Sequence, residues 1–264
     1  MKVGIGVVAA VARHPAVTAM EIATLARCYP GRVVPGIGHG LAFWTDQMGL
    51  TAKSPLTALE ERVTAVRELL AGATVDRTGA QFTFAGIALA HPPREEVPIL
   101  TGVLGPKSLR LSGRVADGTV MSVLSGAKYL EWALGHIRTG MAEGGRSTHL
   151  TPTFALFNCA PAGARASVRT PLAHYLAAVG PHCPLLKPYG YQDALAELMP
   201  GGAEQIERDL PGEWVDELAV AGDPDQVTER IHALLEAGAT SVVLSPADRT
   251  TAATALELAA KAFG

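Results

Sequence analysis

Short apolar segments alternate with helical segments along most of this chain, and no other feature limits its fold as strongly. The segments Val3–Val8, Arg32–Ile37 and Pro98–Val103 have the length and apolar character of buried strands. Each is followed by a stretch with the spacing of an amphipathic helix. Strands that alternate with helices form parallel sheets with right-handed crossovers. The sequence therefore predicts an α/β fold in one domain over residues 1–264, as a barrel or as an open doubly wound sheet.

The pattern predicts six parallel strands, of which the other three are Thr119–Val123, Thr151–Asn158 and Thr240–Ser245. Helices are indicated by N-cap residues, by proline at the first helical position and by terminal glycine. They are expected at Pro15–Tyr29, from Ser54 to Gly72, at Lys107–Val115, Tyr129–Glu143 and Ala164–Val179, from Asp223 to Gly238, and at Thr250–Ala262.

Three details qualify this pattern. Residues 74–91 interrupt the alternation and read as a small β-hairpin, and residues 180–215 read as short helices and loops. The first helix is expected to bury one apolar face, formed by Val17, Met20, Ile22, Leu25 and Ala26.

Composition excludes several classes of protein. Hydrophobic residues make up 48% of the chain and charged residues 18%, which supplies a core and argues against disorder. The net charge is −3 and no basic cluster is present, so a nucleic-acid partner is not expected. The three cysteines show neither metal-ligand nor disulfide spacing, so we expect no metal and a cytoplasmic location. No segment has the length of a membrane span, and Val3–Ala12 reads as a strand rather than a signal peptide.

The segment from Val97 to Gly118 carries the strongest chemical signal. A short strand ends at a turn on Gly105 and Pro106, and a helix opens at once with Lys107 and Ser108. Free amides at a helix N-terminus beside a lysine suit a phosphate group. The spacing is that of neither a Walker A loop nor a dinucleotide-binding glycine fingerprint. The turn either binds a phosphate-bearing ligand or simply joins a strand to a helix.

Four segments in order resemble the luciferase-like superfamily of flavin-dependent monooxygenases and reductases that use the deazaflavin coenzyme F-420. They are Arg13–Val17 with Ala23–Leu25, Tyr29–Arg32 with Gly36–Gly40, the Gly102–Gly118 junction, and Ala221–Gly238 with Val242–Leu244. The resemblance implies a TIM-barrel-like (β/α) fold. The chain begins at what resembles the third strand, so about six of eight strands are expected and two strand edges need cover. A homodimer or another assembly would cover them.

The resemblance also implies roles for individual residues. It assigns the phosphate and ribityl chain of the cofactor to the strand-to-helix turn, namely Val103, Leu104, Gly105, Lys107 and Ser108. It places Gly6 and Val7 of the first strand behind the cofactor ring, where a strained and sometimes cis peptide occurs in the family.

Gly38 and His39 follow the second strand at the same end of the sheet. His39 could donate a hydrogen bond to the ring or act as an acid–base group, or it could be an ordinary surface histidine. Some related deazaflavin enzymes carry an acid where Leu41 stands, which removes support for an acid-catalysed step of that kind. Trp44 is expected to pack in the interior rather than line a pocket, and Asp117 to form a turn.

Taken together, the resemblance implies an FMN- or F-420-dependent oxidoreductase that acts on a small organic molecule by hydride transfer or monooxygenation. The alternative is a shortened, non-catalytic flavin-binding homologue or partner subunit. The sequence does not name the substrate.

Overall fold

The computed structural model describes residues 1–262, and its contacts divide it into two compact units. Unit 1 comprises Met1–Val120 and His136–Leu150, and unit 2 comprises Met121–Gly135 and Thr151–Gly264. A grouping by contacts is compatible with one domain or with two, so the single domain over 1–264 stays a prediction.

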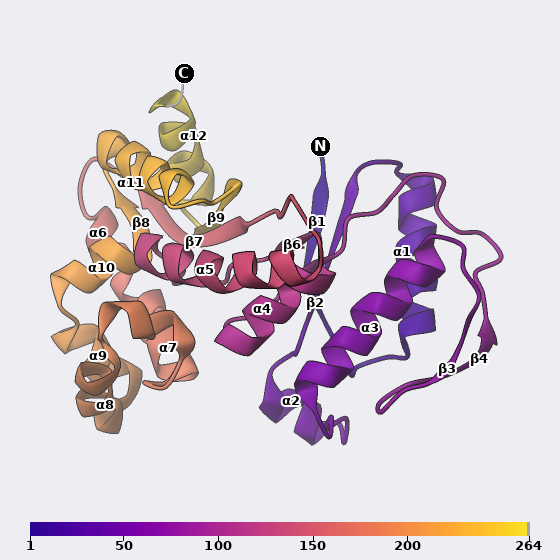
Figure 1. Cartoon of the computed structure of the whole chain (residues 1–264). Coiled ribbons are helices and arrows are strands. Elements are labelled where there is room, and N and C mark those ends of the chain that lie inside the picture. The colour runs from indigo at the N-terminus through magenta and orange to yellow at the C-terminus, as the bar shows by residue number, and fades with distance from the viewer. Residues whose placement is uncertain (263–264) are drawn as a thin grey trace. The chain divides into compact units, whose positions relative to one another are not determined.

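Unit 1 is built on a four-stranded parallel sheet with the strand order β1-β2-β5-β6. A separate antiparallel hairpin, β3–β4, falls within residues 74–91, which confirms that prediction. The strands are β1 (Val3–Ala9), β2 (Val33–Gly38), β3 (Val75–Thr78), β4 (Thr83–Ile87), β5 (Leu100–Gly102) and β6 (Gly118–Thr119). The helices are α1 (Pro15–Cys28), α2 (Ala42–Gln47), α3 (Pro55–Leu70) and α4 (Pro106–Val115), as Figure 1 shows.

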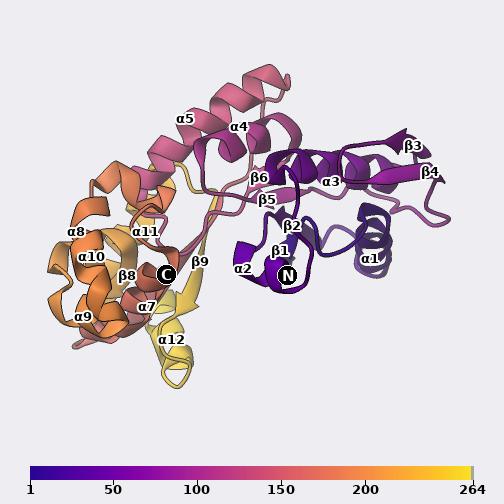
Figure 2. The ribbon, with the colours of Figure 1, turned by 90° about the horizontal axis from the view of Figure 1, so that it is seen from below.

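Local sequence explains where the helices of unit 1 begin. Ser54 caps α3, with its hydroxyl accepting from the Thr57 amide, and proline occupies the first helical turn. His14 caps α1 through Nδ1, which accepts from the Ala16 amide at 3.2 Å. Both helices bury their small and aliphatic residues within this unit, and Figure 2 shows α3 lying along the β3–β4 hairpin.

The predicted apolar face of α1 is wrong in part. Ile22 and Ala26 are buried, but Val17, Met20 and Leu25 are exposed. The helix instead packs through its small residues, including Ala16, Ala19 and Ala23. Small side chains let α1 lie close to its neighbours, so the helix buries its alanine-rich face and leaves the larger apolar side chains outside.

Unit 2 contains a three-stranded parallel sheet in the order β8-β7-β9. Its strands are β7 (Pro152–Cys159), β8 (Ala219–Gly222) and β9 (Ser241–Pro246). Its helices, with α5 continuing into unit 1, are α5 (Ala127–Glu143), α6 (Ala164–Ser167), α7 (Arg169–Val179), α8 (Gln192–Leu198), α9 (Gly202–Asp209), α10 (Gly212–Leu218), α11 (Pro224–Glu236) and α12 (Ala252–Ala262). Short 3-10 turns occupy Pro184–Tyr189 and Met199–Gly201.

The structure corrects the predicted strands in two places. Among the described residues seven strands form parallel ladders, one more than predicted. The additional strand is β8, whose four residues were too few to be recognised beside the Gly- and Pro-rich segment that precedes it. The predicted strand Thr119–Val123 ends early, because Ser122–Gly126 forms a tight turn in which the Ser125 amide donates to the Ser122 carbonyl. The prediction of a parallel α/β fold is confirmed, and the described strands do not form a closed barrel.

Candidate functional site

The predicted site residues lie within unit 1, near the carboxyl ends of β1, β2 and β5. These strands are parallel neighbours, so their carboxyl ends meet at one edge of the sheet. His39 directly follows β2, and Ser108 lies in the first turn of α4, which follows β5. Their side chains meet, with His39 Nε2 2.9 Å from Ser108 Oγ. Residues separated by 69 positions are thereby joined at this edge.

His39 is half-buried, and its surroundings shift the pKa of its ring. Burial lowers the pKa of its ring below 6.5, and the backbone of Pro55 opposes this shift in part. The Nδ1 atom is buried and has no partner at ordinary hydrogen-bond distance and angle within residues 1–262, so the Pro55 backbone acts on the ring only as a weak, distant acceptor. An imidazole with a lowered pKa is neutral at pH 7, so one ring nitrogen can donate a proton and the other can accept one.

The N-terminus of α4 presents free amides. Gly105 is the N-cap residue, Pro106 occupies the first turn, and no side chain caps the helix. The first intrahelical bond of the ladder runs from the Leu109 amide to the Gly105 carbonyl. The amides of Lys107 and Ser108 therefore lie at the positive end of the helix dipole, and the exposed Lys107 side chain adds a cation there.

A buried set of hydroxyl groups fixes α4 against the sheet. Thr101 Oγ1 on β5 donates to Ser112 Oγ on α4 at 2.6 Å, and Ser112 Oγ lies 2.6 Å from Thr119 Oγ1 on β6. Thr119 in turn lies 2.8 Å from His149 Nε2. These contacts hold the helix that carries Lys107 and Ser108 in a defined position on its two strands.

Val7 and three glycines form the third part of the site. The Gly6–Val7 peptide bond is cis. A Cβ atom added at Gly36, Gly38 or Gly102 would come within 3 Å of a Val7 methyl group. The Val7 side chain thus occupies space that side chains on β2 and β5 would otherwise fill, which explains glycine at these positions.

The remaining sequence expectations have mixed outcomes. Val103 is buried, Leu104 and Gly105 are half-buried, and Gly6 is exposed. Trp44 is 54% exposed beside Phe43, so its expected interior packing is wrong.

Asp117 does more than form a turn. Its carboxylate accepts from the Ile99 amide and pairs with both Arg67 and Arg146. Asp117 therefore joins the start of β5, the end of α3 and the segment after α5. Spacing along the sequence carried no signal for these long-range ion pairs.

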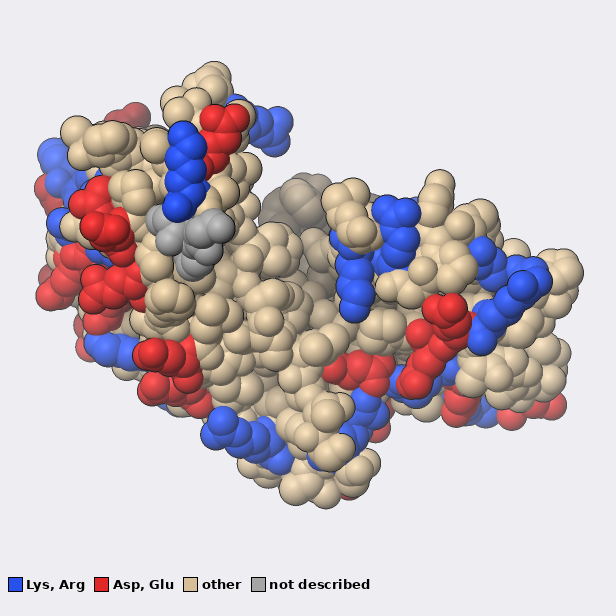
Figure 3. All heavy atoms as spheres, turned by 90° about the horizontal axis from the view of Figure 1, so that it is seen from above, with Lys and Arg blue, Asp and Glu red and all other residues tan. Residues whose placement is uncertain are grey.

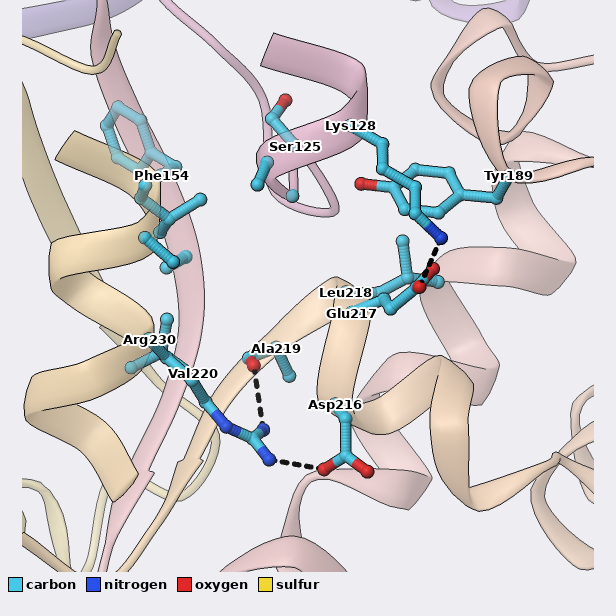
Figure 4. A pocket seen from close by; sticks show the side chains of 15 residues that line it. Ser125, Lys128, Phe154, Tyr189, Asp216, Glu217, Leu218, Ala219, Val220 and Arg230 are labelled. Atoms are coloured by element: carbon cyan, nitrogen blue, oxygen red, sulfur yellow. Dashed lines mark hydrogen bonds and ion pairs between the residues drawn. The ribbon is translucent and has the colours of Figure 1, made fainter. Parts of the chain in front are cut away.

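A separate pocket of about 190 Å³ lies entirely in unit 2, between the start of α5, β8 and α11 (Figure 4). Its walls include Phe154, Leu218 and Val220. Lys128 pairs with Glu217, and Arg230 pairs with Asp216, so the charged groups around it already have partners. None of the predicted site residues lines this pocket.

Neither the face shown in Figure 3 nor any side-chain cluster of the described residues points to a nucleic acid or a metal ion as a ligand. On the face shown in Figure 3, basic and acidic side chains are interspersed and no continuous basic area appears. No cluster of three or more His, Cys, Asp or Glu residues suited to a metal ion occurs between residues 1 and 262. No described helix is long and apolar enough to cross a membrane.

Parallel strands with helical crossovers define an α/β protein, and the candidate site residues lie at the strand carboxyl ends, as they do in TIM barrels. Residues 1–241 match the luciferase-like monooxygenase family. The chain belongs to this family, as the sequence predicted.

Among its curated relatives is a 5,10-methylenetetrahydromethanopterin reductase of Archaeoglobus fulgidus, which is 31% identical over 256 residues, covering 92% of this chain and 76% of the relative. An F-420-dependent glucose-6-phosphate dehydrogenase of Nocardia farcinica is 30% identical over 254 residues, covering 92% and 72%.

Solved structures agree on the fold. The F-420-dependent tetrahydromethanopterin reductase of Methanopyrus kandleri superposes with a TM-score of 0.81 at 25% identity, covering 98% of this chain and 81% of that one. The oxygenating constituent of 3,6-diketocamphane monooxygenase from Pseudomonas putida, solved with FMN, gives a TM-score of 0.66 at 21% identity, covering 98% and 77%.

Proposed function

We propose that this chain is an oxidoreductase that binds a phosphorylated deazaflavin or flavin at the His39–Ser108 site and acts on a small organic molecule. The observation that carries the proposal is the contact between His39 and Ser108 at the uncapped start of α4. F-420 is favoured over FMN, because F-420 is named in relatives of 25% and 30% identity, whereas the FMN-bound neighbour is 21% identical.

The residues present fit such a cofactor. The uncapped amides of Lys107 and Ser108 and the Lys107 ammonium group would hold the phosphate, with Val103, Leu104 and Gly105 along the ribityl chain. Gly6, Val7 and Gly38 would lie behind the ring, where the Val7 side chain fills the space beside the three glycines. The buried Nδ1 atom of His39 has no close hydrogen-bond partner among the described residues, and a ligand would supply one.

The bound cofactor would supply hydride-transfer chemistry, and with FMN also the activation of oxygen. The role of His39 would be to hold or transfer one proton at a ring nitrogen, with Ser108 fixing the ring orientation. Leu41 is exposed and has no ionisable group, so position 41 supplies no acid to the reaction.

Titration of the purified chain with F-420 and with FMN, followed by absorbance and fluorescence, tests this proposal. Saturable binding of either cofactor, with oxidation of its reduced form by added substrates, is the expected result. Binding without turnover would support the non-catalytic homologue, which the exposed edge strand β1 favours. Failure of both cofactors to bind would overturn the proposal.

We also propose that the partner is a second copy of this chain or another assembly that covers β1. The edge position of β1 and the exposure of Val3 and Val7 support this. Cys28, Cys159 and Cys183 are all free thiols, which supports a reducing location such as the cytoplasm.

A further inference from the structure

Arg62 on α3 is a buried cation without an acidic partner. Its side chain is completely inaccessible to solvent, and burial lowers its pKa to about 10, so it remains charged at pH 7. Among the described residues no carboxylate forms an ion pair with Arg62, and Glu21, which pairs with Arg13, raises the pKa of Arg62 only from a longer distance. A buried charge with only neutral partners is costly, so a structural or functional reason for keeping it is expected.

The partners of Arg62 all belong to the segment that follows β1. Its Nη1 donates to the carbonyl oxygens of Ala10, at 2.7 Å, and of Arg13. Its Nη2 donates to Thr18 Oγ1 at the start of α1. One planar guanidinium therefore fixes three points of the chain between the carboxyl end of β1 and the first turns of α1.

This segment is bonded directly to the strand end that carries His39. The Ala10 amide donates to the Gly38 carbonyl at 2.7 Å, and Ala9 pairs with Gly38 in the ladder. A Cβ atom at Gly40 would lie 2.7 Å from the Ala9 Cβ, so the residues on both sides of His39 lie against the end of β1. From the other side, Ser108 contacts the His39 ring.

We infer that Arg62 is a positioning residue of the candidate site, because it holds the β1–α1 segment against Gly38 and Gly40 and so sets the place of His39 opposite Ser108. The inference rests on the proposed function of that site. Arg62 is buried beneath the β1–α1 segment and bonds only to Ala10, Arg13 and Thr18 among the described residues. Its effect passes through Ala10 and the backbone of β2.

Arg67 provides a matched comparison on the same helix. It also bridges α3 to loops, donating to the Val115 carbonyl at 3.1 Å and to Asp117 Oδ2 at 2.8 Å. Those partners lie before β6, away from the carboxyl ends of β1 and β2. A substitution of Arg67 therefore removes a bridge from the same helix that ends at the last residue of α4, at the opposite end of that helix from Ser108.

The test compares Arg62→Lys with Arg67→Lys. Lysine keeps the charge but has a single nitrogen atom in place of the two separated Nη atoms that bond the carbonyls and Thr18, so the two variants separate charge from geometry. The readouts are the NMR signal of the His39 ring, assigned with His39→Asn, and the affinity for F-420 and FMN. We expect Arg62→Lys to shift the His39 signal and to weaken cofactor binding about tenfold, and Arg67→Lys to leave both unchanged.

Thr18→Val is a milder second variant if Arg62→Lys does not fold. It removes one acceptor of the guanidinium and leaves the charge, and a smaller shift of the His39 signal in the same direction is expected. An unmoved His39 signal in the folded Arg62 or Thr18 variant, or an equal shift in Arg67→Lys, would overturn the inference. Loss of the proposed function alone would show as a wild-type chain that binds neither cofactor while the His39 signal still responds to Arg62→Lys.

Discussion

Lys107 is the residue whose role the structure makes easiest to isolate. It stands exposed where α4 presents its first amides, and the helix has no side-chain cap. Replacing Lys107 with alanine should weaken FMN binding about tenfold, since a charged hydrogen bond of this kind contributes roughly 1.5 kcal/mol. Riboflavin, which has no phosphate, should lose little affinity. Fluorescence titration with both ligands measures the difference.

Arg110→Ala is the control for this prediction. Arg110 is exposed on the same helix and pairs with Glu143, so its removal changes the net charge of α4 equally without altering the first turn. Wild-type affinity of Arg110→Ala for FMN is expected. If Lys107→Ala weakened riboflavin and FMN to the same extent, the phosphate would have to lie elsewhere.

At the scale of elements, short-range signals were readable in the sequence and long-range contacts were not. Ser54-Pro55 and Asp223-Pro224 mark helix starts by local chemistry, and the structure shows a cap at each. The two-residue β6 and the exposed face of α1 depend on packing against distant segments, which spacing does not encode.

In the candidate site, too, features formed by consecutive residues were predictable from the sequence, and contacts between distant residues were not. The strand-to-helix turn at Gly105 was visible because its residues are consecutive. The contact of Val7 with Gly38 and Gly102 was not, and neither was the burial of Arg62, because an arginine in an amphipathic helix ordinarily reads as a solvated residue.

His149 links the stability of α4 and β6 to pH. Burial and the nearby Arg146 lower its pKa to about 4, with Asp117 and the Ala116 backbone opposing the shift. Between pH 6.5 and pH 4 the unfolded chain therefore binds a proton that the folded chain does not, so the free energy of unfolding falls as the pH falls. We expect a loss of at most about 2 kcal/mol between pH 7 and pH 5 from this residue.

Urea unfolding of the wild type and of His149→Gln at both pH values measures this contribution. Glutamine can still bond to Thr119 but does not titrate, so the variant should lose less stability on acidification. The exposed His174 on α7 serves as the control, and His174→Gln should keep the wild-type pH dependence. Identical pH dependence in His149→Gln and the wild type would contradict the assignment.

For the whole molecule, the exposed surface of unit 1 bears on assembly. β1 is the edge strand of its sheet and is mostly exposed, and α1 presents Val17, Met20 and Leu25 to solvent. An open strand edge and an exposed apolar helix face each favour association, because the backbone groups of the one and the apolar area of the other lack partners.

We therefore expect the chain to associate at micromolar concentration, and Val17→Glu with Met20→Glu to shift it to a monomer. Two carboxylates on that face of α1 could enter an interface only at the cost of their hydration. Leu235→Glu on α11 is a matched control, because Leu235 is similarly exposed but belongs to unit 2. Light scattering coupled to size-exclusion chromatography measures the mass of each variant. A wild-type monomer, or an equal response to Leu235→Glu, would show that this face of unit 1 does not drive association.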